Sequence, residues 1–499
     1  MGLSMNKEIL LAAVLVGIAI FFATYRLAES PPVWYDEGFY VQSAANLASY
    51  GRMGLQFAPD TIAQSALITV GYPLIYPLAL WFQTFGADIS SARSLMVVFI
   101  LGFLIASYFL VRRLFGAGYA LSALTLLATF PPLYGNGKSV LGEVPGLFYL
   151  VVFLICFIAA RPQTGVKRYA WLVAAGLVAG FSVATKPTFL LLLPAIALGS
   201  FLEWRRGTFT LAELSVAAFS GLIPVLYWFV SQFGTSDSLS YVLANYANPY
   251  QIQDMLQIIW KNIERLFADV GGLYLVLLMG MWISAFAIRI RKGVAISSPE
   301  IIAFVFALLT IGNYARTTGW YRYLFEAQIL SLMFLPHSFW VVGEGVYRRL
   351  ETLMPRLGQY VPSLAKAVFA VVVLLAALGG YQVLFSSFVA EAYQSHRTAF
   401  WETYFNEVSP ATSFFFYNTP EVAFFSESRN YYQYLNPYEI RGLPGEGWPI
   451  GEKQLEVVKA GIPDKVVLRS SAYKEQELFK AYEVSQETYQ YTILSKKPL

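Results

Sequence analysis

The stretch RSLMVVFILGFLIASYFLVRR, residues 93–113, decides the fold class of this chain. Between Arg93 and the pair Arg112 and Arg113 it contains no charged residue, and its length fits the about 20 apolar residues that a helix needs to cross a bilayer. Similar runs recur along the chain. We count about eleven candidate spans, at 8–28, 93–111, 117–134, 145–160, 169–185, 188–203, 211–231, 271–288, 299–314, 323–342 and 364–385.

The composition of the whole chain agrees with this pattern. Of 499 residues, 57% are hydrophobic and only 13% are charged, whereas soluble domains carry about 25% charged residues. No single soluble core could bury so much apolar surface, so lipid must cover it. The 17% aromatic content also fits a membrane protein, because Tyr and Trp favour the headgroup zone. The sequence therefore predicts an all-α polytopic membrane protein, and the net charge of +4 indicates no nucleic-acid partner.

Cysteine and histidine usage narrows the possible chemistry. Cys156 is the only cysteine and lies in an apolar run, so a disulfide framework and a thiolate metal site are excluded. His337 and His396 are the only histidines, which excludes a histidine-rich metal cluster and argues against a Ser-His-Asp triad.

The orientation follows from the basic residues in the short loops. Alternate connections are rich in Lys and Arg, and such loops face the cytoplasm. We therefore expect a multi-pass plasma-membrane protein with a cytoplasmic N-terminus, and an odd number of spans places the C-terminus outside. The run at 8–28 resembles a signal peptide, but no clear cleavage site follows it and we count it as a span. The basic groups are Arg112 and Arg113; Arg161, Lys167 and Arg168; Arg205 and Arg206; Arg289, Arg291 and Lys292; and Arg348, Arg349 and Arg356.

Two outer segments are too long to be simple connectors. In the loop 29–92, the pattern predicts an amphipathic helix over Glu37–Tyr50, ended by Gly51, and a second apolar helix over Tyr72–Phe85. We expect both helices to lie along the membrane interface.

The tail after about residue 390 has a different composition and predicts a small soluble α/β domain. We therefore expect a membrane domain at 1–390 and an extracytoplasmic domain at 391–499. Its predicted strands are 413–417, 465–468 and 489–494, and its predicted helices are 421–426 and 451–459. Its tyrosines Tyr431, Tyr432, Tyr434 and Tyr438 could stack on sugars, although ordinary packing explains them as well.

Acidic residues occur at two outer loop–helix junctions. Asp36 and Glu37 follow the first span directly, within Trp34–Gly38, and Glu143 comes just before Pro145 at the start of the fourth span. Each acid has a structural explanation, because an acid at a helix start caps it or complements its dipole. The functional alternative is a set of carboxylates that face a common cavity.

Basic residues also gather on the outer side, against the positive-inside bias. An Arg guanidinium matches the oxygens of a phosphate, and Lys binds it as a point charge. The structural alternatives are a snorkelling Lys and contact with anionic lipid headgroups. The candidate phosphate-binding residues are Arg93, Lys138, Lys186, Arg316, Tyr321 and Arg322.

These acids and cations fit the use of a lipid-phosphate donor. The cations would stabilise the phosphate as it leaves, and a carboxylate would take the proton of an acceptor hydroxyl. Because phosphate is a good leaving group, no dedicated general acid is needed.

In its motifs the chain resembles the GT-C superfamily of membrane glycosyltransferases, in particular the protein O-mannosyltransferases and the lipid A aminoarabinose transferase. The resemblance covers roughly residues 8–345. Two departures are the absence of a trefoil-type domain in an outer loop and Glu143, where Asp is more usual. The matching pieces are Asp36-Glu37 after the first span, Ala92-Arg93, Gly142-Glu143-Val144-Pro145, Thr185-Lys186-Pro187 and Arg322-Tyr323.

The resemblance implies a hexosyl- or pentosyltransferase of GT-C fold that uses a polyprenyl-phosphate sugar and inverts the anomeric carbon. It implies Asp36 as the base, with Glu37 and Glu143 as further catalytic acids, and Arg322, Lys186 and Arg93 at the lipid phosphate. Some relatives need a divalent metal, which Asp36, Glu37 and Glu143 could hold. The acceptor stays open between a protein, a glycolipid and a lipid-linked glycan. The alternatives are a transporter and a non-catalytic lipid-binding homologue in surface-glycan assembly.

Overall fold

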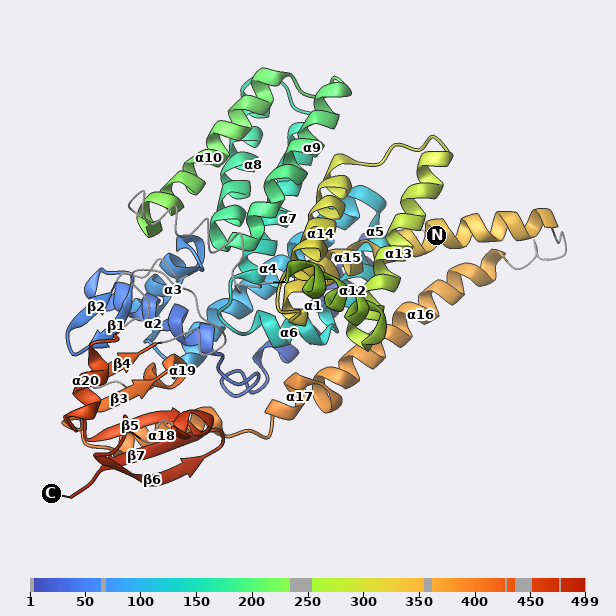
Figure 1. The fold of residues 1–499 in the computed structure, drawn as a ribbon. Coiled ribbons are helices and arrows are strands. Elements are labelled where there is room, and N and C mark those ends of the chain that lie inside the picture. The colour runs from blue at the N-terminus through green and yellow to red at the C-terminus, as the bar shows by residue number, and fades with distance from the viewer. Residues whose placement is uncertain are drawn as a thin grey trace.

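The computed structural model combines a large bundle of apolar helices with a small mixed sheet at one end of the bundle (Figure 1). Long helices cross the upper and middle parts of the view, and the sheet lies below them near the C-terminus. The structure describes residues 4–63, 69–233, 254–353, 361–426, 429–435, 451–474 and 477–498.

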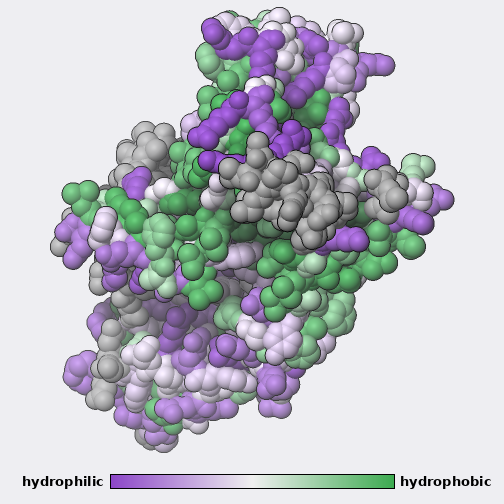
Figure 2. Space-filling view, turned by 90° about the vertical axis from the view of Figure 1, so that its right-hand side faces the viewer, coloured by the Kyte–Doolittle hydropathy of each residue, from purple (hydrophilic) through white to green (hydrophobic). Residues whose placement is uncertain are grey.

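Within these residues, ten helical segments are long and apolar enough to cross a membrane, which confirms the integral membrane class. They match ten of the eleven expected spans. Figure 2 shows hydrophobic side chains gathered over the middle of the molecule and hydrophilic ones towards its two ends. The segments are α1 (Met5–Thr24), α4 (Ile89–Phe115), α7 (Glu143–Ala160), α8 (Gly165–Thr185), η1 with α9 (Pro187–Leu191, Leu192–Arg205), α10 (Leu211–Phe233), α13 (Val270–Arg291), α14 (Ser298–Ala315), η2 with α15 (Tyr321–Leu324, Phe325–Leu353) and α16 (Val361–Tyr381).

The eleventh expected span, 117–134, is not one helix. The structure divides it into α5 (Ala117–Ala128) and α6 (Pro131–Gly137). The break precedes Pro131, which lacks an N–H for a continuing helix but suits the first position of a new one. At about 1.5 Å per residue, α5 alone is too short to cross a bilayer.

Together, α5 and α6 nevertheless run the length of the bundle. At their start, Arg112 at the end of α4 pairs with Glu8 at the beginning of α1 (2.5 Å). At their end, the Lys138 ammonium donates to the carbonyl of Tyr25, just after α1 ends (3.3 Å). The chain therefore passes from one end of the bundle to the other between these points.

The arginine-rich end of the bundle is held by ion pairs. Acids on the helices neutralise many of the arginines that define the predicted cytoplasmic side, so this end is electrostatically satisfied. The pairs are Arg112–Glu8, Arg161–Glu203, Arg206–Glu203, Arg168–Glu213 and Arg289–Glu300.

The segment between α1 and α4 contains both expected helices, α2 (Tyr35–Tyr50) and α3 (Tyr72–Phe85). Helix α2 ends at Gly51, whose φ of 66° suits glycine. A short hairpin of β1 (Leu55–Ala58) and β2 (Thr61–Ala63), which the sequence did not suggest, lies between the helices.

The C-terminal region forms a five-stranded sheet of order β4-β3-β5-β7-β6. Strand β3 pairs in parallel with β4 and β5, whereas β7 pairs antiparallel with β5 and β6. The three expected strands are present, but β4 and β6 were missed; Tyr438 lies outside the described residues. The strands are β3 (Phe414–Tyr417), β4 (Tyr431–Tyr434), β5 (Lys465–Arg469), β6 (Tyr482–Thr488) and β7 (Tyr491–Lys496).

Short helices cover the sheet and connect it to α16. Apolar side chains pack on both of its faces, one of them under α18. The two helices expected here are present but shorter than predicted, as α19 and α20. The elements are η4 (Gln382–Ser386), α17 (Phe388–Ala392), α18 (Arg397–Glu407), α19 (Pro420–Ala423), α20 (Gln454–Lys459) and η5 (Ser470–Lys474).

Candidate active site

Charged side chains from four separate parts of the sequence meet at the end of the bundle nearest the sheet. They come from the start of α2, the start of α7, the junction between α8 and η1, and the segment formed by η2 and α15. Several of these groups are buried, and buried charges need partners.

Asp36 pairs with Arg322 across 286 positions of sequence. The Arg322 Nη2 donates to Asp36 Oδ2 at 2.6 Å, and the side chain of Asp36 is 30% exposed. The Arg322 guanidinium also lies 5.5 Å from the ring centre of Trp320 and 5.4 Å from that of Tyr323. Asp36 is not the N-cap of α2, because Trp34 holds that position. Its carboxylate is therefore free of a capping role.

The ion pair sets the protonation state of Asp36. Burial of the carboxyl group raises its pKa, but the charge and hydrogen bond of Arg322, together with the charge of Lys186, hold the pKa of Asp36 below its ordinary value. Asp36 is thus an anion at neutral pH that retains some access from outside.

Glu143 and Lys186 form a second, more deeply buried ion pair. Lys186 Nζ donates to Glu143 Oε1, and the two side chains are only 8% and 3% exposed. Gly142, with φ of 87°, lets the chain enter α7 so that Glu143 begins the helix. Among the described residues, Glu143 Oε2 has no hydrogen-bond partner.

Two residues of this cluster were not found from the sequence. Glu326, in the first turn of α15, is 2% exposed and lies within electrostatic range of Glu143, Lys186 and Arg322. Tyr40, on α2, is within range of Asp36; burial and the Asp36 charge raise the pKa of its hydroxyl well above the ordinary value. An isolated acid in an apolar span is a signal that could have revealed Glu326.

Glu37 and Arg93 are adjacent to this cluster but closed off from solvent. Arg93 Nε and Nη2 donate to the two Glu37 oxygens at 3.0 and 2.9 Å, and both side chains are 0% exposed. The same carboxylate accepts from the backbone N–H groups of Trp34 and Val140, both at 3.2 Å.

Every nitrogen of the Arg93 guanidinium is occupied, since its Nη1 donates to the carbonyls of Leu27, Ala28 and Pro31. This geometry favours a positioning role for Glu37 and Arg93 over the catalytic and phosphate-binding roles expected from the sequence.

Lys138 is also fully buried. Its ammonium donates to the Tyr25 carbonyl and lies 5.5 Å from the centre of the Tyr393 ring. Burial and the nearby charge of Arg93 lower the pKa of Lys138 to about 7. The structure thus groups Lys138 with the closed Arg93 region and not with Asp36.

Tyr321 and Arg316 belong to the segment before α15. The Tyr321 hydroxyl donates to Asp269 Oδ2 at 2.5 Å, so this side chain faces the start of α13. Arg316 is exposed after the end of α14.

The three acids suggested as metal ligands do not form a matching donor set. Both Glu37 oxygens are taken by Arg93 and backbone N–H groups, and Asp36 and Glu143 are each neutralised by a cation. In the described part of the chain, no group of three or more His, Cys, Asp or Glu residues is arranged to hold a metal ion.

The C-terminal region packs directly on the helix that carries Asp36. The Cα of Gly38 approaches α19 so closely that an added Cβ would lie 2.4 Å from the Glu421 backbone nitrogen. The Arg469 guanidinium pairs with Glu421 (2.8 Å) and lies 5.5 Å from the ring centre of Tyr35, next to Asp36. The sheet therefore contributes to the position of α2.

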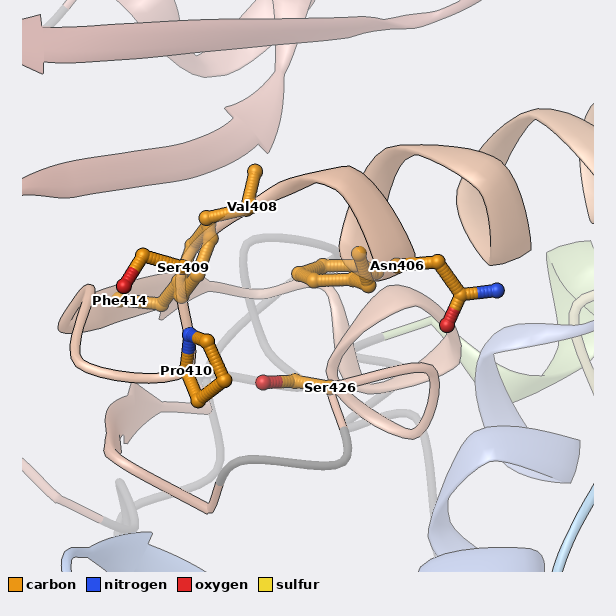
Figure 3. Close-up of a pocket in the computed structure, with 7 residues that line it drawn as sticks. Asn406, Val408, Ser409, Pro410, Phe414 and Ser426 are labelled. Carbon is orange, nitrogen blue, oxygen red and sulfur yellow. The ribbon is translucent and has the colours of Figure 1, made fainter.

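A separate cavity of about 410 Å³ lies within the C-terminal region (Figure 3). None of the expected site residues lines it. Its wall is formed by Phe405, Asn406, Val408, Ser409, Pro410, Phe414 and Ser426.

The polar cluster lies at one end of the spanning helices. A family model described as dolichyl-phosphate-mannose-protein mannosyltransferase matches residues 72–228. This segment runs from α3 to α10 and includes Arg93, Glu143 and Lys186.

Solved structures match over nearly the whole chain. The apo and undecaprenyl phosphate-bound structures of ArnT from Cupriavidus metallidurans are each 14% identical, with a TM-score of 0.62, and the match covers 99% of this chain and 98% of theirs. The oligosaccharyltransferase AglB from Archaeoglobus fulgidus, in complex with an inhibitory peptide and a dolichol-phosphate, is 13% identical with a TM-score of 0.55, covering 93% of this chain and 69% of AglB. A comparison with curated protein sequences gives no match. The chain thus resembles these transferases in fold.

Proposed function

We propose that this protein is an integral membrane glycosyltransferase that moves a sugar from a polyprenyl-phosphate donor to a hydroxyl group on the non-cytoplasmic face. The donor class is supported by the lipids bound in the similar structures, undecaprenyl phosphate in ArnT and dolichol-phosphate in AglB. The acceptor is a hydroxyl of a protein, a glycolipid or a lipid-linked glycan.

The observation that carries this proposal is the Asp36–Arg322 ion pair beside Lys186. It joins a partly exposed carboxylate, which stays ionised, to two cations at one site. Such a combination suits a reaction in which a proton is accepted and a phosphate leaves.

Arg322 retains capacity for a phosphate. Arg322 Nε has no hydrogen-bond partner among the described residues, although Nη2 is engaged by Asp36. A phosphate oxygen could therefore accept from Nε while Asp36 keeps its place. Thr188 Oγ, two residues after Lys186, is likewise buried without a partner in the described structure.

In the proposed reaction, Asp36 accepts the proton of the acceptor hydroxyl as its oxygen attacks C1 of the donor sugar. The new C1–O bond forms while the C1–O bond to phosphate breaks, and the electron pair departs with the polyprenyl phosphate. Arg322 and Lys186 stabilise the added negative charge. Attack opposite to the leaving group inverts C1.

The proposed orientation places this cluster on the outer side of the plasma membrane. It lies at the opposite end of the spans from the arginine groups around Glu8, Glu203 and Glu300, and basic groups mark the cytoplasmic side. Residues 1–390 would then form the catalytic membrane domain, with 391–499 as an extracytoplasmic domain that packs on α2.

The test is donor turnover in liposomes. Polyprenyl-phosphate sugars with different sugar groups are supplied, with nucleotide sugars as negative controls, and release of polyprenyl phosphate is followed for the wild type, Asp36→Asn and Asp60→Asn. Asp60 is an exposed turn residue in the same outer segment, and its φ of 57° accommodates Asn.

We expect turnover of at least one lipid-linked donor by the wild type and Asp60→Asn, and a loss of about 10²–10⁴-fold in Asp36→Asn. Equal turnover by all three proteins would contradict the role of Asp36. Turnover of nucleotide sugars alone would contradict the donor class.

A further inference from the structure

Helix α12 (Met255–Ala268) is not a membrane span, yet one of its faces is strongly apolar. Leu256, Trp260 and Phe267 are 81%, 65% and 62% exposed. Their spacing of four and seven residues puts them on a single face, with Ile263 between them. A soluble surface would not leave such a stripe uncovered.

The stripe is continuous with the membrane-facing surface of α13. Helix α12 ends at Asp269, and the exposed apolar residues Val270, Leu273 and Leu277 of the spanning helix α13 follow at once. Charged residues Lys261 and Glu264 lie on a flank of α12. This arrangement is typical of a helix that lies in the plane of the membrane surface.

The opposite face of α12 holds the backbone that leads to Arg322. Asn262 is 0% exposed, and its Nδ2 donates to the carbonyls of Tyr314, Ala315 and Thr317, at 3.4, 3.1 and 2.7 Å. These carbonyls belong to the end of α14 and the turn after it. They lack hydrogen-bond partners within the helix, and the buried Asn262 amide supplies them.

Further contacts fasten the same turn. Arg265 Nη1 donates to the Thr318 carbonyl at 3.3 Å, and Tyr321 donates to Asp269 at the end of α12. Gly319 has φ of 80°, and a Cβ added there would lie 2.3 Å from Asn262 Oδ1. The turn is therefore fitted closely against α12, three residues before Arg322.

We propose that α12 is a membrane-surface helix whose apolar stripe is held by lipid of the outer leaflet and whose Asn262 is a positioning residue that keeps Arg322 beside Asp36. The bilayer surface would thereby set the geometry of the phosphate-binding arginine. The proposal rests on the proposed function only for the role of Arg322.

The membrane contact is tested without any turnover. In a Cys156→Ala background, single cysteines at 256, 267 and 261 are spin-labelled, and the protein is reconstituted in phosphatidylethanolamine–phosphatidylglycerol vesicles. Labels at 256 and 267 should collide more with oxygen than with a water-soluble nickel chelate, and the label at 261 should show the reverse. Equal access of the nickel chelate to all three sites would overturn the lipid contact.

The positioning role is tested with Asn262→Asp, which keeps the side-chain shape but removes the donor, and with Gln257→Glu as a matched control. Gln257 is exposed on the same helix, and its side chain makes no hydrogen bond in the described structure. A spin label at position 316 should become more mobile in Asn262→Asp and stay unchanged in Gln257→Glu. Unchanged mobility in both variants would overturn the positioning role, whatever the protein transfers.

A kinetic readout separates positioning from simple loss of stability. If Arg322 moves away from Asp36, the acid limb of the pH–rate profile should shift to higher pH in Asn262→Asp, with kcat/KM about tenfold lower. Gly319→Ala should give the same shift if Asn262→Asp does not fold. A lower rate with an unshifted acid limb in the folded variants would contradict the proposal.

Discussion

Two neighbouring carboxylates, Asp36 and Glu37, have opposite environments. Glu37 and Arg93 are fully buried, and all their polar atoms are engaged. Asp36 and Arg322 keep partial exposure and an unused guanidinium N–H. The difference shows that an acid pair at a helix start can divide its work, because successive helix positions point to different sides. Under the proposed function, Glu37 fixes the helix and Asp36 is available for chemistry.

The closed pair, Glu37 and Arg93, should contribute more to the stability of the fold than an exposed ion pair does. Glu37→Gln leaves the Arg93 charge buried without a counter-ion, and we expect a loss of about 3–5 kcal/mol in the free energy of unfolding. Thermal unfolding in detergent measures it. The control is Glu344→Gln, in an exposed pair with Arg348, which should cost less than about 1 kcal/mol. Similar losses of stability in Glu37→Gln and Glu344→Gln would contradict the structural role of the buried Glu37–Arg93 pair.

The open pair, Asp36 and Arg322, should dominate the pH dependence of activity. Arg322→Gln removes the main charge that lowers the Asp36 pKa, while burial still raises it. The acid limb of the pH–rate profile should therefore move to higher pH, with activity at neutral pH about 10²-fold lower. Lys186 and Tyr40 are also within electrostatic range of this carboxylate and remain in the variant. An unshifted acid limb would mean that Asp36 is not the titrating base.

The contact between α2 and α19 should have a smaller effect on stability. It connects the helix that carries Asp36 and Glu37 to the C-terminal sheet region. Gly38→Ala places a methyl group against the backbone of Glu421, and we expect a loss of about 1–3 kcal/mol in stability together with reduced turnover. Gly17→Ala in α1, where the methyl group meets open space, is the control in the same assays. Unchanged stability in Gly38→Ala would show that α2 and α19 separate easily.

The smallest effect concerns Lys138. Its pKa in the folded protein is about 7, against an ordinary value of 10.5. Between these values the unfolded chain binds more protons, so stability should rise as pH increases from 7 towards 10. Lys138→Met should remove this rise, which we expect to be about 2–4 °C in unfolding temperature between pH 7 and 9. An equal rise in the variant would assign it to other groups.

The sequence predicted the class of this fold well, because each span is encoded locally by a continuous apolar run. The helices at 37–50 and 72–85 were also predictable from local pattern and from Gly51. The segment 117–134 was expected to be one helix because its hydropathy stays high through the Phe130–Pro131 break, where the structure divides it into α5 and α6.

The site was only partly predictable, since pairing between distant residues leaves no local mark. Asp36, Glu143, Lys186 and Arg322, which the structure brings together, stood out in the sequence as charged residues at loop–helix junctions. Nothing local, however, says that Asp36 meets Arg322 while Glu37 meets Arg93. The contacts of Asn262 with the 314–317 carbonyls depend on tertiary packing and were not foreseen.

The central claim is tested most directly by the turnover of a polyprenyl-phosphate sugar per folded molecule in Asp36→Asn and Glu37→Gln, with the folded fraction fixed by size-exclusion chromatography. We expect Asp36→Asn to fold normally and to lose at least about 10²-fold in turnover, whereas folded Glu37→Gln, which affects only the position of α2, loses clearly less. Turnover that survives in Asp36→Asn, or is lost equally in folded Glu37→Gln, would contradict the assignment of chemistry to the open pair.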